Sequence, residues 1–143
     1  MARRLDEGLI LKDGLTLDPG PRGYLMSGRI DCAEGMAIDV RKVLRILSGE
    51  GPTAMVQTVD YAYHVLLADL GNVFRYCSPH DDGDHPGHKP FHHKHVYDVL
   101  IGDVVGTVEA TGDDEWPTLG EVIEEARDWY SAYAERIEMI RSR

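Results

Sequence analysis

The chain is poor in cysteine and in long apolar runs, and each shortage excludes a class of protein. Its 143 residues include two cysteines, Cys32 and Cys77, which form at most one bridge and do not make a disulfide scaffold. We expect both to be free thiols. No apolar run approaches the roughly 20 residues that span a bilayer, and no apolar stretch follows the first arginines as in a secretory signal. We expect a cytoplasmic protein without a membrane segment.

Basic residues are also scarce. The chain has 15 Lys and Arg residues against 25 Asp and Glu residues, which gives a formal net charge of −10. This charge disfavours broad binding to nucleic acid, which depends on displacing counterions from the phosphates, so any contact with RNA must be local. At this length, and without internal repeats, residues 1–143 are expected to form a single domain.

Short apolar segments predict β-strands along the first two thirds of the chain. Segments 9–17 and 24–32 are separated by a stretch rich in proline and glycine. Residues 36–40 alternate as a half-buried strand requires, whereas RKVLRIL at 41–47 fits either a continuation of that strand or a helical turn. Residues 95–110 predict one or two further strands, interrupted near Gly102.

The clearest hairpin joins QTVDYAYHVLLAD, residues 57–69, to VFRYCS, residues 73–78. A two-residue turn at Gly71 and Asn72 places residue 66 opposite residue 77, whereas a three-residue loop with a bulge is expected to reverse the second strand. Side chains alternate along a strand. With the two-residue turn, one face of the hairpin carries His64, Arg75 and Cys77. The other face is the expected core side and gathers Val65, Leu67, Phe74 and Tyr76.

The last segment carries the best helix signal. Thr118 and Glu121 form a capping box directly after Pro117, which predicts a helix over about residues 118–141. One apolar stripe recurs at helical spacing and needs a partner surface: Leu119, Val122, Ile123, Ala126, Tyr130, Tyr133, Ile137 and Ile140. We expect an α+β fold, an antiparallel sheet of about five to seven strands with this long C-terminal helix packed on one face.

Six of the seven histidines lie between Cys77 and His95, in CSPHDDGDHPGHKPFHHKH. Imidazole titrates near neutral pH, and neighbouring imidazoles push each other's pKa apart, so one site can hold both an acid and a base. Nearby cations can stabilise a phosphate, and they are Arg75, Lys89 and Lys94. Together these groups predict RNA cleavage without a metal, with His93 or His95 as the base and Arg75 as the phosphate-stabilising group.

The same stretch also permits a metal site. Thiolate and imidazole are zinc ligands, and the candidate ligands are Cys77, His80, His93 and His95. On a strand, His93 and His95 point to the same side. Three carboxylates nearby would suit a harder divalent ion, and they are Asp81, Asp82 and Asp84. The middle of the stretch, DDGDHPGHKP, is typical of a surface loop in which His85 and His88 have no role.

Four short motifs in one order make the chain resemble a known family. They are YAYH at 61–64, VFRY at 73–76, SPH at 78–80 and PFHHKHV at 90–96. This order resembles the TumE family of bacterial and archaeal toxin-antitoxin proteins, which typically shows Y-x-Y-H, then F-R-Y-D-N-x-P-H-H, then F-P-H-H-K-H. The resemblance covers roughly residues 36–127 and is most specific in the histidine-rich motif region, residues 61–96.

The resemblance implies a toxin that inhibits growth and is encoded beside a helix-turn-helix antitoxin. Carried over position by position, the motif residues are His64, Arg75, His80, His92, His93, Lys94 and His95. The chain departs from the family where Cys77 and Ser78 replace the usual Asp-Asn. A thiolate is a poor substitute for a carboxylate that orients a histidine, but it binds a soft metal well.

Three hypotheses follow from these residues. The first is a toxin that acts as a small endoribonuclease without a cofactor. The second is a non-catalytic module that binds zinc, another divalent metal or nucleic acid. The third is a structural interaction domain, and a homo-oligomer is compatible with all three.

Overall fold

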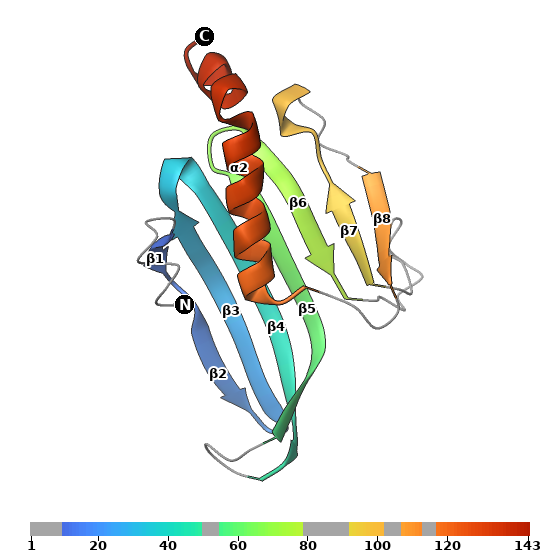
Figure 1. The fold of residues 1–143 in the computed structure, drawn as a ribbon. Helices are drawn as coiled ribbons and strands as arrows, with labels where there is room; N and C mark the ends of the chain where they lie inside the picture. The colour runs from blue at the N-terminus through green and yellow to red at the C-terminus, as the bar shows by residue number, and fades with distance from the viewer. Residues whose placement is uncertain (1–9, 50–54, 79–91, 102–106, 113–116) are drawn as a thin grey trace.

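The computed structural model describes residues 10–49, 55–78, 92–101, 107–112 and 117–143, and it has the expected α+β architecture (Figure 1). One antiparallel sheet lies behind a single long helix, with strand order β1-β3-β4-β5-β6-β7-β8 and β2 paired to β3. The strands are β1 (Ile10–Asp13), β2 (Thr16–Gly20), β3 (Gly23–Cys32), β4 (Met36–Ser48), β5 (Met55–Leu67), β6 (Gly71–Cys77), β7 (His92–Val96) and β8 (Thr107–Gly112). The helices are the short η1 (Ala33–Gly35) and η3 (Val99–Ile101) and the long α2 (Leu119–Arg141).

The first apolar segment forms two strands, not the single strand expected over residues 9–17. Strands β1 and β2 lie along the same edge of β3, one after the other, and together fill one position of the sheet. Between them the backbone N–H of Gly14 donates to the carbonyl oxygen of Arg29 at 3.0 Å. A Cβ at Gly14 would lie 2.7 Å from that oxygen. The segment breaks here because only glycine allows so close an approach of two backbones.

Residues 41–47, which fitted a strand or a helical turn, continue strand β4. Strands β4 and β5 are each 13 residues long and form the longest hairpin of the sheet. The register shifts between Val43 and Leu44, where β5 has one extra residue, Val59. Such a bulge increases the local twist, and β5 is strongly curved at this end while it stays paired with β4 (Figure 1).

The β5–β6 hairpin keeps the expected faces with a different turn. The connection is residues 68–70, three residues long, and not the two-residue Gly71-Asn72 turn. Leu66 pairs with Asn72, but the next pair is Val65 with Phe74, so Val73 is a bulged residue. A three-residue connection alone would exchange the two faces to which the side chains of β6 point. The extra residue in the bulge restores the expected facing. The expectation that such a loop with a bulge reverses the strand was therefore wrong.

Helix α2 covers one face of the sheet and begins as its sequence predicts. The Thr118 side chain accepts from the backbone of Glu121, and the Glu121 side chain accepts from the backbone of Thr118. Its buried residues are Val122, Ile123, Ala126 and Ile137. They pack in one core with buried side chains of β3 to β6, including Ile30, Ile38, Tyr61, Tyr63, Val65, Leu67 and Phe74. Of the helices in the described part of the chain, none is long and apolar enough to cross a membrane.

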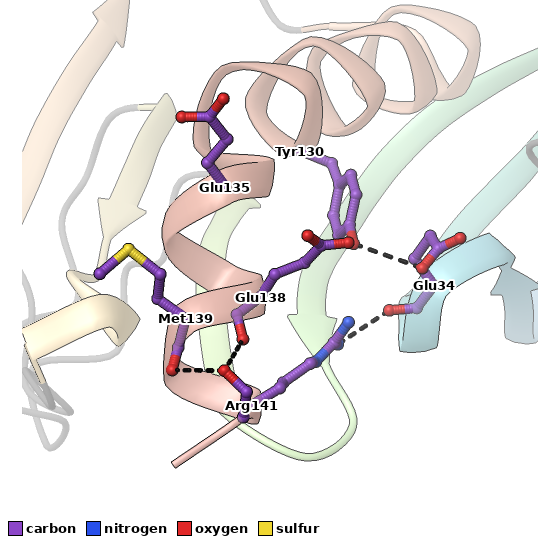
Figure 2. A pocket seen from close by; sticks show the side chains of 7 residues that line it. Glu34, Tyr130, Glu135, Glu138, Met139 and Arg141 are labelled. Atoms are coloured by element: carbon purple, nitrogen blue, oxygen red, sulfur yellow. Dashed lines mark hydrogen bonds between the residues drawn. The ribbon is translucent and has the colours of Figure 1, made fainter.

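The C-terminal end of α2 is tied to two connections at one end of the sheet. Arg141 donates to both carboxylate oxygens of Asp69, at 2.8 and 3.0 Å, and to the backbone oxygen of Glu34 at 2.8 Å. Tyr130 also donates to the Glu34 carboxylate (Figure 2). Glu34 has a positive φ of 64°, a conformation that favours glycine. These contacts hold the turn between β3 and β4 against the helix.

Candidate functional site

Strand β7 divides the histidine motif between the two faces of the sheet. Alternate side chains of a strand point in opposite directions, and β7 carries HHKHV at 92–96. His93 and His95 lie on the face away from α2, which we call the distal face, and His92 and Lys94 lie on the face that α2 covers. The motif predicts one site made of all four residues, but the structure places the two pairs on opposite faces of the sheet.

His92 and Lys94 make contacts that belong to the packing of α2. Lys94 Nζ lies 2.5 Å from a carboxylate oxygen of Glu125 in α2, and it stands over the rings of Phe74 and Tyr76. His92 Nδ1 lies 2.8 Å from the hydroxyl of Tyr61, and the two rings are stacked. His92 also lines a groove of about 370 Å³ with Tyr61. Burial raises the pKa of Tyr61, so its hydroxyl stays protonated.

The distal face holds the other predicted residues in two neighbouring rows. In one row His64 of β5 lies opposite Arg75 of β6, and Arg75 lies opposite His95 of β7. In the next row Cys77 of β6 lies opposite His93. Adjacent strands are about 4.8 Å apart, so Arg75 lies between two imidazoles on its own face. This grouping of His64, Arg75 and Cys77 on one face agrees with the sequence prediction, although the register differs.

His64 is oriented by a residue that the sequence analysis had assigned to the turn. Its Nε2 lies 2.8 Å from the side-chain oxygen of Asn72. Because an amide oxygen only accepts, His64 Nε2 carries a proton, and in the neutral ring Nδ1 is the free base. Burial is the largest cause of a lowered pKa at His64, and the charge of Arg75 adds to it, although the Asn72 hydrogen bond and the charge of Asp39 oppose it. His64 is therefore neutral at neutral pH.

The row continues into β4 and β3, where sequence reasoning found no site residue. Asp39 lies opposite His64, and Arg29 lies opposite Asp39. Arg29 donates to both oxygens of Asp39, at 2.7 and 3.0 Å. The alternation of β4 placed Asp39 on the face away from Ile38, but a single sequence does not show that this face meets His64. Arg29 and Asp39 form a charge pair at the border of the row.

Cys77, His93 and His95 form a compact group at the other side of the row. One potential ligand atom from each side chain lies within 4.8 Å of the other two. The rings of His93 and His95 meet edge to face at 4.9 Å, and His95 stacks on Tyr97. Cys77 is 2% exposed and His93 is fully buried. Burial raises the pKa of Cys77, and Arg75 opposes that rise by its charge and a hydrogen bond.

The remaining predicted residues lie outside the described part of the chain. They are His80, Asp81, Asp82, Asp84, His85, His88 and Lys89. The two cysteines are free, as expected, because they lie on opposite faces: Cys32 is in the core under α2 and Cys77 is on the distal face. The groove at the C-terminal end of α2, shown in Figure 2, contains none of the predicted site residues.

No family model, no curated protein and no solved structure matches this chain. The function is therefore inferred from the distal face and from the motifs at residues 61–96.

Proposed function

We propose that the chain is the toxin of a toxin-antitoxin pair and that it cleaves RNA at the row formed by His64, Arg75 and His95. The observation that carries this proposal is that His64, whose pKa is lowered mainly by burial, lies opposite Arg75, which has no carboxylate partner among the described residues. Among the described residues Arg75 forms no ion pair, and its buried Nε has no hydrogen-bond acceptor. Four other cations are each paired with an acid, and they are Arg29, Arg41, Lys94 and Arg141.

Arg75 has no such pair within the described residues, although the chain has 25 acidic residues and a net charge of −10. Guanidinium binds phosphate through two parallel hydrogen bonds and stays charged at every working pH. His64, Arg75 and His95 are each only partly buried, so a phosphate can approach their row. The charge of the whole protein opposes wide contact with RNA. We infer a small contact, centred on one phosphodiester.

The proposed reaction uses His64 as the proton acceptor, not His93 or His95. His93 is fully buried, whereas His64 presents a neutral ring whose Nδ1 is free to accept. His64 Nδ1 takes the proton of the 2′-hydroxyl, and the oxygen attacks the adjacent phosphorus. The bond from phosphorus to the 5′-oxygen breaks, water protonates that oxygen, and a 2′,3′-cyclic phosphate remains. Arg75 stabilises the negative charge on the phosphorus centre. His95 borders the same position from β7.

The test is cleavage of a labelled single-stranded RNA by the purified chain. We expect His64→Gln and Arg75→Gln each to lower the cleavage rate by about 10²-fold or more, the range for loss of a general base or of a charge-stabilising donor. Arg41→Gln is the matched control, because Arg41 is on the same face but paired with Asp60 at 2.7 Å. His92→Gln controls for a histidine on the other face.

Neither role needs a metal ion, so cleavage is expected with and without EDTA. No cleavage by the parent protein, or equal cleavage by the parent and His64→Gln, would overturn the ribonuclease proposal. Expression of the parent in the cytoplasm of bacteria is expected to arrest cell growth. A helix-turn-helix protein encoded beside it is expected to relieve the arrest. Toxicity that His64→Gln leaves unchanged would mean a different mode of action.

The second candidate is a non-catalytic module, and the group of Cys77, His93 and His95 favours it. Such a module would bind RNA or a metal and leave the RNA intact. A gel-shift assay on uncleaved RNA separates the two candidates, since it detects binding where the cleavage assay detects no product.

A further inference from the structure

The convergence of three donor atoms on the distal face goes beyond the proposed chemistry of His64 and Arg75. We propose that Cys77, His93 and His95 bind one zinc ion. Their potential ligand atoms lie within 4.8 Å of one another. Around a tetrahedral zinc, with Zn–S near 2.3 Å and Zn–N near 2.0 Å, neighbouring ligand atoms are about 3.3–3.8 Å apart. Shifts of about 1 Å in the side chains therefore bring the group into binding geometry.

The sheet holds the three ligands in place. Cys77 and His93 are directly opposed on β6 and β7, and His95 is two residues further along β7, so it points to the same side. The backbone of each strand is paired on both sides, β6 with β5 and β7, and β7 with β6 and β8. Only side-chain rotation is needed to close the site, and the ion would join the β6 and β7 strands.

The donor types and their burial select the metal. Thiolate and imidazole favour zinc and other soft or borderline ions, whereas magnesium and calcium prefer carboxylate and carbonyl oxygens. Cys77 is 2% exposed and His93 is fully buried, so water competes little for the ligands. Three protein ligands leave one position of a tetrahedral zinc for a further ligand.

Cys32 is a buried cysteine that has no other metal-binding side chain grouped with it among the described residues. Cys32 is also nearly fully buried, at 3% exposed, but it lies in the apolar core with Ile10 and Met36. Among the described residues, Cys77 lies in a group of metal-binding side chains, and Cys32 lies in none. Cys32 is therefore a matched internal control for burial of a thiol.

The experiment measures metal in the full chain, purified without a metal-binding tag. We expect about one zinc per chain by elemental analysis, the stoichiometry of one three-ligand site. Titration of the metal-free protein with Co²⁺ is expected to give intense visible bands and a thiolate-to-metal charge-transfer band, which report a cobalt-bound Cys77. Zinc is also expected to raise the thermal midpoint of the metal-free protein, because it binds only the folded form.

Variants decide which residues hold the ion. His95→Gln, at a partly exposed position, is expected to weaken zinc binding by more than about 100-fold, beyond the usual effect of a residue that only orients a ligand. Cys77→Ser is expected to remove the charge-transfer band. Cys32→Ser and His64→Gln are the controls and are expected to bind zinc as the parent does.

Two outcomes would overturn the site: a parent protein that takes up neither zinc nor Co²⁺, or controls that lose binding as strongly as His95→Gln. The titration of the parent needs no variant, so a misfolded Cys77→Ser protein does not block the test. Zinc binding without RNA cleavage would leave this inference intact and overturn the ribonuclease. Cleavage by a protein that binds no zinc would do the reverse.

Discussion

At the residue scale, two arginines of the distal face are paired with acids, and Arg75 has no acidic partner within the part of the chain that the structure describes. Arg29 pairs with Asp39, and Arg41 pairs with Asp60. Exposed pairs of this kind contribute about 0–1 kcal/mol each to stability, so they neutralise charge more than they hold the fold. Arg75 lies between His64 and His95, and no described carboxylate pairs with it. A bound phosphate would supply the missing negative charge.

The lowered pKa of His64 predicts a loss of stability in acid. In the unfolded chain His64 takes up a proton near pH 6.5, whereas in the folded protein burial and the charges of Arg75 and Arg29 delay that uptake to lower pH, against the opposing effects of Asp39 and Asn72. The unfolded state then binds more protons in this window. The free energy of unfolding should fall as the pH drops from about 6.5 through the folded pKa.

The measurement is urea unfolding of the parent and of His64→Gln between about pH 5 and 8. The stability of the parent relative to the variant is expected to decrease toward the acid end. Parallel curves would contradict a lowered pKa at His64. If His64 is also the catalytic base, the acid limb of kcat/KM for RNA cleavage lies below about pH 6.5.

At the element scale, helix α2 is the part of the protein most completely described by its own sequence. Its capping box and its buried stripe both occur where local rules place them. One difference is Tyr133, which belongs to the predicted stripe but is 43% exposed. Ile137, one turn nearer the C-terminus, is fully buried. The ring of Tyr133 lies instead against Trp129 of the same helix, with the ring centroids 5.3 Å apart.

The cap predicts a measurable loss of stability. Thr118→Ala removes the oxygen that accepts from the backbone of Glu121 at 3.2 Å, and we expect the free energy of unfolding to fall by about 1 kcal/mol. Thr118→Ser keeps the oxygen and should stay close to the parent. Chemical denaturation measures both. Equal stability of the alanine and serine variants would show that the capping box does not stabilise α2.

At the scale of the whole molecule, the two faces of the sheet differ because α2 covers one of them. The face under α2 holds the apolar core together with His92 and Lys94, and the distal face holds the predicted site. Arg141 fixes the far end of α2 to the β3–β4 and β5–β6 connections. This contact joins segments that are 72 and 107 residues apart in the chain.

Arg141→Gln is expected to loosen this end of the protein more than it lowers global stability. The Asp69 side chain is 49% exposed, so the ion pair contributes no more than about 1 kcal/mol, and added salt should reduce the difference from the parent. Hydrogen exchange at residues 33–36 is expected to become faster in the variant. Arg143→Gln, at the adjacent turn, is the control. If hydrogen exchange at residues 33–36 is unchanged in Arg141→Gln, Arg141 does not hold the β3–β4 turn against α2.

The sequence by itself determined the features that depend on local periodicity. Alternation along each strand decided that Val65 and Leu67 share one face and that His93 and His95 share another, and helical spacing with a cap decided the bounds of α2. These patterns are local because the backbone of a strand or helix sets where each side chain points. They were enough to predict an α+β fold with one helix on a sheet.

Only the tertiary structure decided which residues of different strands meet. A three-residue connection and the bulge at Val73 replaced the expected turn, and they moved Arg75 opposite His64 while keeping its face. The pairing of β5 with β6 also brought Asn72 to His64, and the pairing of β6 with β7 placed Cys77 opposite His93. On the other face, His92 meets Tyr61 and Lys94 meets Glu125 of α2. Register depends on the packing of segments far apart in the chain. A bulge of one residue changes it without leaving a periodic signal in the sequence.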